Sequence, residues 1–407
     1  MSALALLSGP PLRPIPFPRW PQFNDVERRQ LLEVLESGKW GGYPFPNSKA
    51  REFGSRFAQA HSAHYGLAVA NGTVAIEIAL KAIGLKPGDE VIVPAYTWDG
   101  TAGAVMFAGG IPVFVDSDPE TYCLDPTLLN AAVSPRTRAI IPVHLGMNMA
   151  DMDAITGFAA THKLSVIEDC AHAHGAQWHG CGAGSLGNLG AFSFQTSKLM
   201  TAGEGGGIIT NSQELAERCE VLINCGRSSE ADTFGYRAVG HNYRMTDFQA
   251  GLLLAQLGRL EEQTTHREAN AAYLETCLAA IGGVTPLKRD PRQTRRAIYQ
   301  YVLRYSPEAF GGAPRDTFVA ALEAEGIPAE GPFYEAVYRS PRFPAPPGSW
   351  RALPCPVAER AAYEESVWIP HWVLLGERAD VEDVAKAVDK IRRHAKELPG
   401  GIHRLRR

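Results

Sequence analysis

The stretch YGLAVANGTVAIEIALKAI, residues 65–83, carries the pattern that decides the fold of this 407-residue chain. Residues 65–70 form a short apolar run of the kind found in strands that are buried on both faces. Residues 73–83 are mostly apolar and long enough for a helix, and Gly72 provides the turn between the two segments. The stretch therefore predicts a strand, a tight turn and a helix in succession.

The same alternation continues as far as residue 210. Further apolar runs lie at residues 91–94, 111–115, 139–143, 164–168, 190–194 and 207–210, and helix candidates lie at 98–108, 128–132 and 151–162. Two helical stretches, residues 24–35 with Asn24 as the N-cap and residues 49–61, precede the first strand. Alternation of this kind predicts an α/β fold with a mostly parallel, doubly wound sheet.

The pattern changes after residue 246. A long helix is expected over residues 246–278, a strand over 299–305, and two further helices over 315–325 and 381–396. This order suggests a smaller α+β domain at the C-terminus. The expected division is an extended, proline-rich N-terminal strap (1–20), a large α/β domain (21–250) and a smaller α+β domain (251–407).

The composition disfavours two classes of partner. The net charge is −4, and apart from a basic tail at residues 403–407 no tract would attract nucleic acid or anionic lipid. The apolar runs are much shorter than the ~20 residues of a membrane span, and residues 1–19 lack the features of a secretion signal. The seven cysteines show no paired spacing, so we expect a reducing, cytoplasmic location.

The segment SFQTSKLMTAGEGGG, residues 193–207, contains the first candidate for chemistry. Lys198 follows the end of a predicted strand, and four glycines later in the segment leave the backbone free to bend. A lysine in such a turn can act as a nucleophile that forms a Schiff base with a carbonyl cofactor. A solvated loop lysine explains the same residues, so the assignment needs partners.

The segment VIEDCAHAHG, residues 166–175, offers such a partner at the C-terminal end of another predicted strand, where ligands of open α/β sheets gather. A carboxylate there could keep a pyridine nitrogen protonated, as the electron sink of pyridoxal phosphate (PLP) requires. Because strand side chains alternate, one of Glu168 and Asp169 faces the site, and we assign Asp169. An aspartate that caps a turn is the alternative explanation.

Two more strand ends fit the same cofactor. Gly72 and Thr73 open a helix whose free amides and positive end suit a phosphate, although an ordinary N-cap explains them too. Trp98, in PAYTWD at residues 94–99, could stack on a flat ring or pack in the core. Each signal is weak alone, but all of these positions follow strands and point to one cofactor.

Two motifs that resemble ligand sites are not interpreted as such. GAGSLG at residues 182–187 matches the GxGxxG spacing of dinucleotide sites, but it precedes a strand instead of linking a strand to a helix. We therefore expect a loop. His172, His174 and Asp169 lack a fourth ligand at a recognised spacing, so no metal site is predicted.

Together with GHNYRM at residues 240–245, the segments 70–73, 94–98, 168–175 and 193–206 resemble those of the DegT/StrS family of PLP-dependent aminotransferases. Members of this family have the type I fold and act on keto-sugars and keto-cyclitols. The likeness extends from about residue 20 to the C-terminal helix and is strongest between residues 65 and 256. It implies a PLP-dependent transaminase.

The resemblance assigns roles to individual residues. Lys198 would form the Schiff base with the cofactor, Asp169 would hold the pyridine nitrogen, and Trp98 would stack on the ring. The cofactor phosphate would be bound by Gly72, Thr73 and Ser193.

Two further positions follow from the resemblance. Asn242 would reach the phosphate of the neighbouring subunit, which implies a homodimer with shared active sites. His172 stands where many members have glutamine, and it could hydrogen-bond the cofactor's phenolic oxygen. A branch of the family that replaces the lysine by histidine dehydrates sugars, and Lys198 argues against that branch.

The substrate class is also an expectation from resemblance. The segments around Asp169 and Lys198 are similar to those of enzymes that aminate scyllo-inosose-type ketones in aminocyclitol antibiotic pathways, with glutamine or glutamate as the donor. Aminohydroxybenzoate synthases, which catalyse dehydration and aromatisation, are the alternative, and a non-catalytic PLP-binding regulator is a weaker one. Residues 331–339 look more like the cyclitol enzymes. Residues 40–46 and 333–339, together with Glu204 and His174, are candidates for the substrate pocket.

Overall fold

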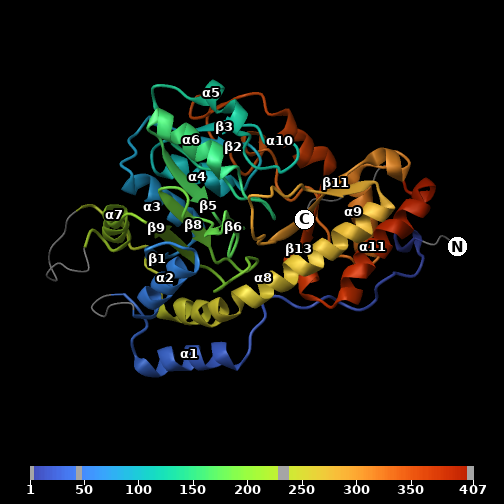
Figure 1. Cartoon of the computed structure of the whole chain (residues 1–407), viewed down its shortest axis with the longest axis horizontal. Helices are drawn as coiled ribbons and strands as arrows, with labels where there is room; N and C mark the ends of the chain where they lie inside the picture. The colour runs from blue at the N-terminus through green and yellow to red at the C-terminus, as the bar shows by residue number, and fades with distance from the viewer. Residues whose placement is uncertain (1–3, 43–47, 228–237, 401–407) are drawn as a thin grey trace.

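The computed structural model describes residues 4–42, 48–227 and 238–400 (Figure 1). Its centre is an eight-stranded sheet that crosses the larger part of the molecule. In spatial order the strands are β1 (Tyr65–Val69), β9 (Gly206–Thr210), β8 (Leu189–Ser193), β5 (Ser165–Asp169), β4 (Thr137–Ile140), β2 (Glu90–Pro94), β3 (Ile111–Val115) and β12 (Arg351–Ala352). The predicted, mostly parallel α/β sheet is confirmed.

Strand β9 is the exception, because it runs antiparallel to both of its neighbours, β1 and β8. A parallel return would need a crossover, which is usually a helix, whereas a loop that carries Lys198 joins β8 to β9. A Cβ at Gly206 would lie 2.2 Å from the carbonyl oxygen of Asn71. Glycine at this position therefore lets β9 pass close to the turn between β1 and the helix that follows it.

Helices between the strands cover the sheet, as the alternation predicted (Figure 1). They are α3 (Gly72–Ala82), α4 (Asp99–Phe107), α5 (Leu129–Ala132), α6 (Met152–His162) and α7 (Gln213–Ile223). The side chains of Asn71, Asp151 and Ser212 cap the N-termini of α3, α6 and α7 by accepting a hydrogen bond from a first-turn amide. Of these helices, α7 was not predicted from the sequence.

The second part of the molecule has its own antiparallel sheet, in the order β10 (Val284–Pro286), β11 (Gln300–Tyr305) and β13 (Ser366–Pro370). Helices α9 (Arg315–Ala324), α10 (Pro356–Arg360) and α11 (Arg378–Arg393) accompany it, and β6 (Gln177–Trp178) and β7 (Cys181–Gly182) form a small separate hairpin. Strand β12, although late in the chain, joins the large sheet beside β3.

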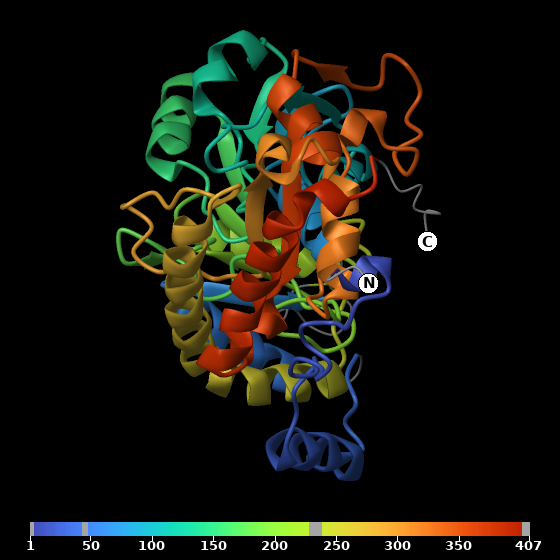
Figure 2. The same ribbon diagram turned by 90° about the vertical axis from the view of Figure 1, so that its right-hand side faces the viewer.

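One long helix, α8 (Asp247–Ile281), runs from below the large sheet to the second sheet (Figure 1). Helices α1 (Asp25–Ser37), α2 (Ser48–Ala60) and α11 contact it, and α1 lies beyond the rest of the molecule at the bottom of Figure 2. The boundary predicted between residues 250 and 251 falls inside α8. The division into domains stays a prediction.

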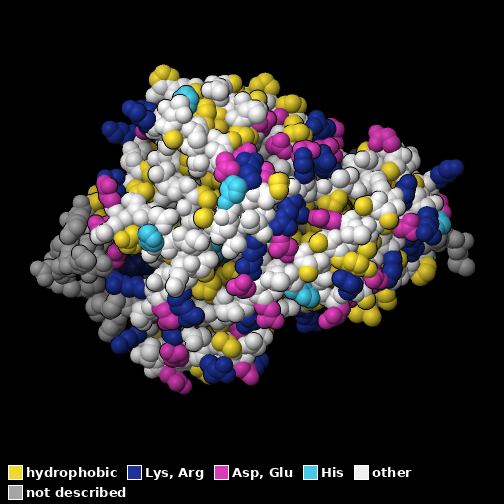
Figure 3. Space-filling view, viewed as in Figure 1, with side chains coloured by type: hydrophobic (Ala, Val, Ile, Leu, Met, Phe, Trp, Pro, Cys, Tyr) yellow, Lys and Arg dark blue, Asp and Glu magenta, His cyan; other side chains and the backbone are white. Residues whose placement is uncertain are grey.

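The N-terminal segment crosses to the C-terminal helices. Arg13 pairs with Asp380 and Asp383 of α11, and the backbone amide of Leu12 donates to the carboxylate of Glu325, which follows α9. The face seen in Figure 3 shows acidic and basic side chains interspersed. Within the described residues no helix is long and apolar enough to cross a membrane. The basic tail at residues 403–407 and most of the segment 40–46 lie outside the described residues.

Candidate active site

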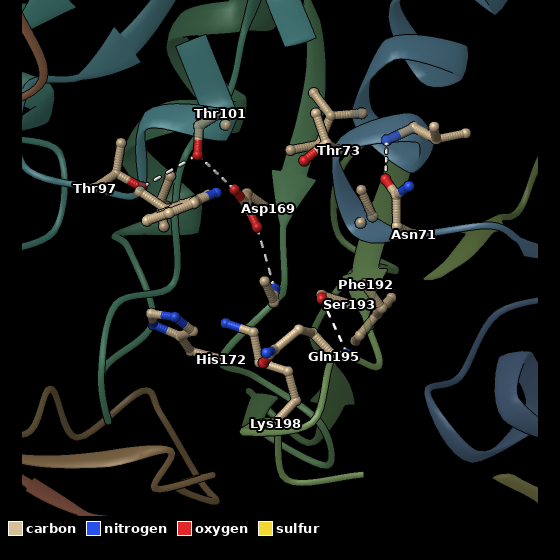
Figure 4. A pocket seen from close by; sticks show the side chains of 18 of the residues that line it. Asn71, Thr73, Thr97, Thr101, Asp169, His172, Phe192, Ser193, Gln195 and Lys198 are labelled. Atoms are coloured by element: carbon tan, nitrogen blue, oxygen red, sulfur yellow. Dashed lines mark hydrogen bonds between the residues drawn. The ribbon is translucent and has the colours of Figure 1, made fainter. Parts of the chain in front are cut away.

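A cavity of about 990 Å³ opens at the C-terminal ends of β1, β2, β5 and β8. Strand ends from one edge of a mainly parallel sheet meet here, which is why residues far apart in the sequence share the site. Figure 4 shows several of these side chains around the cavity. The predicted site residues that line it are Gly72, Thr73, Trp98, Asp169, His172, Ser193 and Lys198.

One end of the cavity is the N-terminus of α3. Asn71 accepts a hydrogen bond from the amide of Val74 at 2.9 Å, whereas the amides of Gly72 and Thr73 have no intrahelical acceptor because they lie in the first turn. A Cβ at Gly72 would lie 2.7 Å from the Cβ of Ser193. The glycine therefore brings free amides and a serine hydroxyl together, as an anion site requires.

The carboxylate of Asp169 faces the cavity from the end of β5 (Figure 4). Thr101 donates its hydroxyl to Oδ2 at 2.8 Å, and the amide of Ala171 donates to Oδ1 at 3.1 Å. Burial raises the pKa of Asp169, whereas these hydrogen bonds and the charge of Lys198 act in the opposite direction. The two donors hold the carboxylate as a fixed acceptor in a position with little solvent.

Glu168, the neighbour of Asp169, points to the opposite side of the sheet, as the alternation predicted. Its fully buried carboxylate accepts hydrogen bonds from the backbone amides of Gly184, Leu186 and Gly187 and contacts His144 Nε2 at 2.9 Å. After Gly182, which ends β7, the GAGSLG motif forms a loop before β8, as expected, and amides of this loop bind a side chain of the protein itself.

The amine of Lys198 lies in the loop after β8 and faces the cavity. Burial lowers its pKa to about 8, and the charge of Asp169 opposes that effect. The Nζ atom lies 4.3 Å from the centre of the Tyr299 ring, and the hydroxyl of Tyr299 is 2.8 Å from that of Ser197. A lysine amine with so low a pKa is partly neutral at physiological pH, which a nucleophile requires.

His172 is buried, and both of its ring nitrogens have partners within the chain. The amide of Gly146 donates to Nδ1 at 3.1 Å, and Nε2 is 3.0 Å from the hydroxyl of Tyr334. The ring also stacks on Tyr299 with a centroid distance of 4.2 Å. His172 lines the cavity. Both of its nitrogens have partners within the chain, and the predicted contact with a phenolic oxygen stays a prediction.

Trp98 precedes α4 and lines the cavity with 48% of its surface exposed, so it is not a core residue. The guanidinium carbon of Arg342 lies 5.4 Å from the centre of the ring. A Cβ at Gly100 would lie 2.7 Å from the indole, so this glycine makes room for the ring. The exposed aromatic face is available for stacking.

Of the three remaining residues that were predicted individually, only one lines the cavity. Glu204 lines the cavity. His174 is buried behind the site, where its Nε2 lies 2.9 Å from the carbonyl oxygen of Ser193. Asn242 does not line the cavity, and it is exposed in the single chain.

Sequence reasoning missed several residues that line the cavity. Thr101 lies one helical turn after Trp98, and a hydroxyl in a small-residue helix was the available signal. Tyr299 comes from the second part of the chain, and no local pattern places it beside strand ends that are more than a hundred residues earlier. Phe333 and Tyr334 also line the cavity, and both belong to the segment 333–339 that was expected to contribute to the substrate pocket.

Comparison with known proteins agrees with this arrangement. Residues 21–389 match the model of the DegT/DnrJ/EryC1/StrS aminotransferase family. A putative L-glutamine:3-amino-2,3-dideoxy-scyllo-inosose aminotransferase of Streptoalloteichus tenebrarius is 43% identical, over 98% of this chain and 99% of the relative. An L-glutamine:2-deoxy-scyllo-inosose aminotransferase of Micromonospora echinospora is 37% identical, over 98% of this chain and 100% of the relative.

Among solved structures, that of 3-amino-5-hydroxybenzoic acid synthase superimposes with a TM-score of 0.86 at 35% identity, over 95% of this chain and 100% of that one. The fold and site therefore define an α/β protein with fold type I of the PLP-dependent aminotransferases. The chain belongs to the DegT/DnrJ/EryC1/StrS aminotransferase family.

Proposed function

We propose that this aminotransferase uses PLP bound at Lys198 to transfer an amino group from glutamine or glutamate to a keto-cyclitol or keto-sugar. The observation that carries the proposal is the arrangement of the cavity. The lysine amine, the buried carboxylate of Asp169 and the open N-terminus of α3 all face the same space.

The residues present fit PLP. The amides of Gly72 and Thr73 and the hydroxyl of Ser193 would hold the phosphate, and the missing side chain at Gly72 keeps this corner open. Asp169 would bind the pyridine nitrogen, and the exposed face of Trp98 would cover the ring. When bound, PLP supplies an electron sink for a carbanion next to the substrate nitrogen.

The protein's own groups then have defined tasks. Lys198, with a pKa near 8, exists in both protonation states close to neutral pH, so its amine can accept and return a proton. Asp169 favours a protonated ring nitrogen because its carboxylate is fixed by Thr101 and Ala171. Amino donor and ketone would use the same groups in turn, which gives ping-pong kinetics.

The relatives support the substrate class, since two of them are named as L-glutamine-dependent aminotransferases of scyllo-inosose-type ketones. The cavity wall agrees with a hydroxylated ring, because Gln195, Ser197, Glu204 and Tyr334 contribute polar groups among aromatic ones. We propose a role in the biosynthesis of an aminocyclitol-containing secondary metabolite.

We further propose a homodimer with shared sites. Asn242 is exposed and outside the cavity of its own chain, so it is free to reach the phosphate site of a neighbouring subunit. The isologous contact of a twofold dimer would supply one asparagine to each site.

The test is the absorbance spectrum of the PLP-loaded protein before and after addition of glutamine or glutamate. We expect the visible band to disappear as the amine form of the cofactor accumulates together with the keto acid. Lys198→Ala should retain PLP only non-covalently and lose turnover, so normal turnover in that variant would exclude the assignment. A protein that only binds PLP as a regulator would release no keto acid.

The resemblance to 3-amino-5-hydroxybenzoic acid synthase, with its TM-score of 0.86, favours a dehydrating and aromatising enzyme as the second candidate. Borohydride would still link PLP to Lys198 in such an enzyme. The spectrum would not respond to either amino donor, however, whereas a cyclic substrate that becomes aromatic by loss of water would be turned over. The donor experiment therefore separates the two candidates.

A further inference from the structure

Tyr334 is a buried cavity residue to which the proposed function gives only a place in the polar wall, without a specific contact. Only 5% of its surface is exposed, yet it lines the cavity. Its ring lies parallel to that of His172 with a centroid distance of 5.9 Å and an interplanar angle of 10°, and 6.2 Å from that of Trp98. Tyr334 thus lies between the predicted ring-stacking residue and the histidine that is held by Gly146.

The direction of the hydrogen bond between His172 and Tyr334 follows from the backbone. The amide of Gly146 donates to Nδ1 of His172, so Nδ1 carries no proton. Burial lowers the pKa of His172 well below its usual range, so the ring is neutral and its single proton is on Nε2. His172 therefore donates to the hydroxyl oxygen of Tyr334 across 3.0 Å.

The hydroxyl hydrogen of Tyr334 is then free. No described residue accepts a hydrogen bond from it. Burial raises the pKa of Tyr334 well above its usual range, so the hydroxyl stays protonated. The titratable groups around it are Tyr299, Asp169, Tyr96 and Asp99. A buried donor without an acceptor is costly, and the cost disappears when a ligand atom accepts the bond.

We propose that Tyr334 donates a hydrogen bond to an oxygen atom of the molecule bound beside Lys198, and that His172 and the amide of Gly146 orient this hydroxyl. The inference rests on the proposed function and adds to it a residue that recognises the bound group. The acceptor is the phenolic oxygen of the cofactor or an oxygen of the ketone. His172 acts as a positioning residue through Tyr334.

The test is Tyr334→Phe, which removes one oxygen and keeps the ring. If the cofactor oxygen accepts the bond, its anionic form loses a stabilising donor. The pH midpoint of the visible absorbance of the PLP-loaded protein then rises by about one unit, because a hydrogen bond to a charged group contributes roughly tenfold or more. If the ketone oxygen accepts it, the midpoint stays and the KM for the ketone rises about tenfold.

A midpoint within 0.2 units and a KM within twofold of the wild-type values, as rough limits set by one hydrogen bond, would overturn the inference. Tyr96→Phe is the matched control. Its hydroxyl is also buried nearby, but it is bonded to Ser366 and Trp368 and lies outside the cavity. This variant is expected to melt earlier without a change in either readout.

A second pair of variants tests the role of His172. His172→Gln keeps one acceptor and one donor and is expected to preserve both readouts, whereas His172→Phe is expected to move them as Tyr334→Phe does. In the Tyr334→Phe background, His172→Phe should add little, because the hydroxyl it orients is gone. Additive losses would contradict the positioning role.

Reductive labelling separates the possible failures. If borohydride does not link PLP to Lys198 of the wild-type protein, the proposed function is wrong. If labelling succeeds and Tyr334→Phe changes neither readout, only the inference about Tyr334 is wrong.

Discussion

The amine of Lys198 has a pKa near 8 instead of 10.5, because burial destabilises its charged form. Only the neutral amine attacks a carbonyl. We therefore expect the rate at which the apoprotein captures PLP to rise with pH through a midpoint near 8, followed by stopped-flow absorbance. Asp169→Asn should lower this midpoint, since the carboxylate raises the pKa of the lysine. A midpoint near 10 would contradict the burial of the amine.

Gly72 is required for space, not for an unusual backbone angle. Gly72→Ala would place a methyl group 2.7 Å from the Cβ of Ser193. Because overpacking of this kind costs about 1–3 kcal/mol, we expect the Kd for PLP to rise about tenfold or more in a fluorescence titration.

The control for this variant is Gly157→Ala in α6, where a Cβ would meet no atom within 4 Å. That substitution should stabilise the protein by about 0.5–1 kcal/mol and leave the Kd unchanged. Equal affinity in Gly72→Ala and the wild type would mean that PLP does not use the corner between α3 and Ser193.

At the scale of elements, Glu168 joins strand β5 to the loop before β8. Its buried carboxylate accepts hydrogen bonds from three backbone amides and contacts His144. Glu168→Gln would replace one of the acceptor oxygens by an NH2 group, which would then face hydrogen-bond donors. Since an unsatisfied buried donor costs about 1–3 kcal/mol, we expect a loss of at least about 2 kcal/mol in urea unfolding.

Glu52→Gln is the control for Glu168→Gln, because Glu52 is exposed on α2 and its ion pair within the described residues is with Arg56. Its effect should stay within about 0.5 kcal/mol. A similarly small effect of Glu168→Gln would show that the loop does not depend on this carboxylate. Because Asp169 is the next residue in β5, we also expect PLP affinity to fall with stability in Glu168→Gln alone.

The sequence alone was sufficient to predict the helices and strands whose apolar residues follow a local pattern. The strand–helix alternation placed Asp169 and Lys198 at strand ends, and the side-chain alternation of β5 separated Asp169 from Glu168. Local patterns could not show that β9 runs antiparallel or that β12 returns to the large sheet, because tertiary pairing decides both. For the same reason Tyr334 was not predicted to lie beside His172.

At the scale of the whole molecule, α8 ties the two sheets together while the N-terminal segment closes onto α9 and α11. Arg13 is bonded to Asp380 and Asp383, and Lys390 pairs with the buried Glu325. The cavity takes residues from both parts, since Lys198 precedes α8 and Tyr299 follows it. Movement of the second sheet relative to the first would therefore change the wall around the lysine amine.

The proposed shared site of a homodimer makes a prediction about mixed subunits. If Asn242 acts across the interface, a hybrid of one Lys198→Ala subunit and one Asn242→Ala subunit contains one site in which both residues are intact. Random mixing of subunits should then restore about a quarter of the wild-type activity, because half of the dimers are hybrids with one working site. The measurement is turnover after the two inactive variants are unfolded and refolded together, with each variant refolded alone as the control. If Asn242 instead serves the site of its own chain, both sites of the hybrid dimer lack one of the two residues. The mixture would then show no more activity than the average of the two variants.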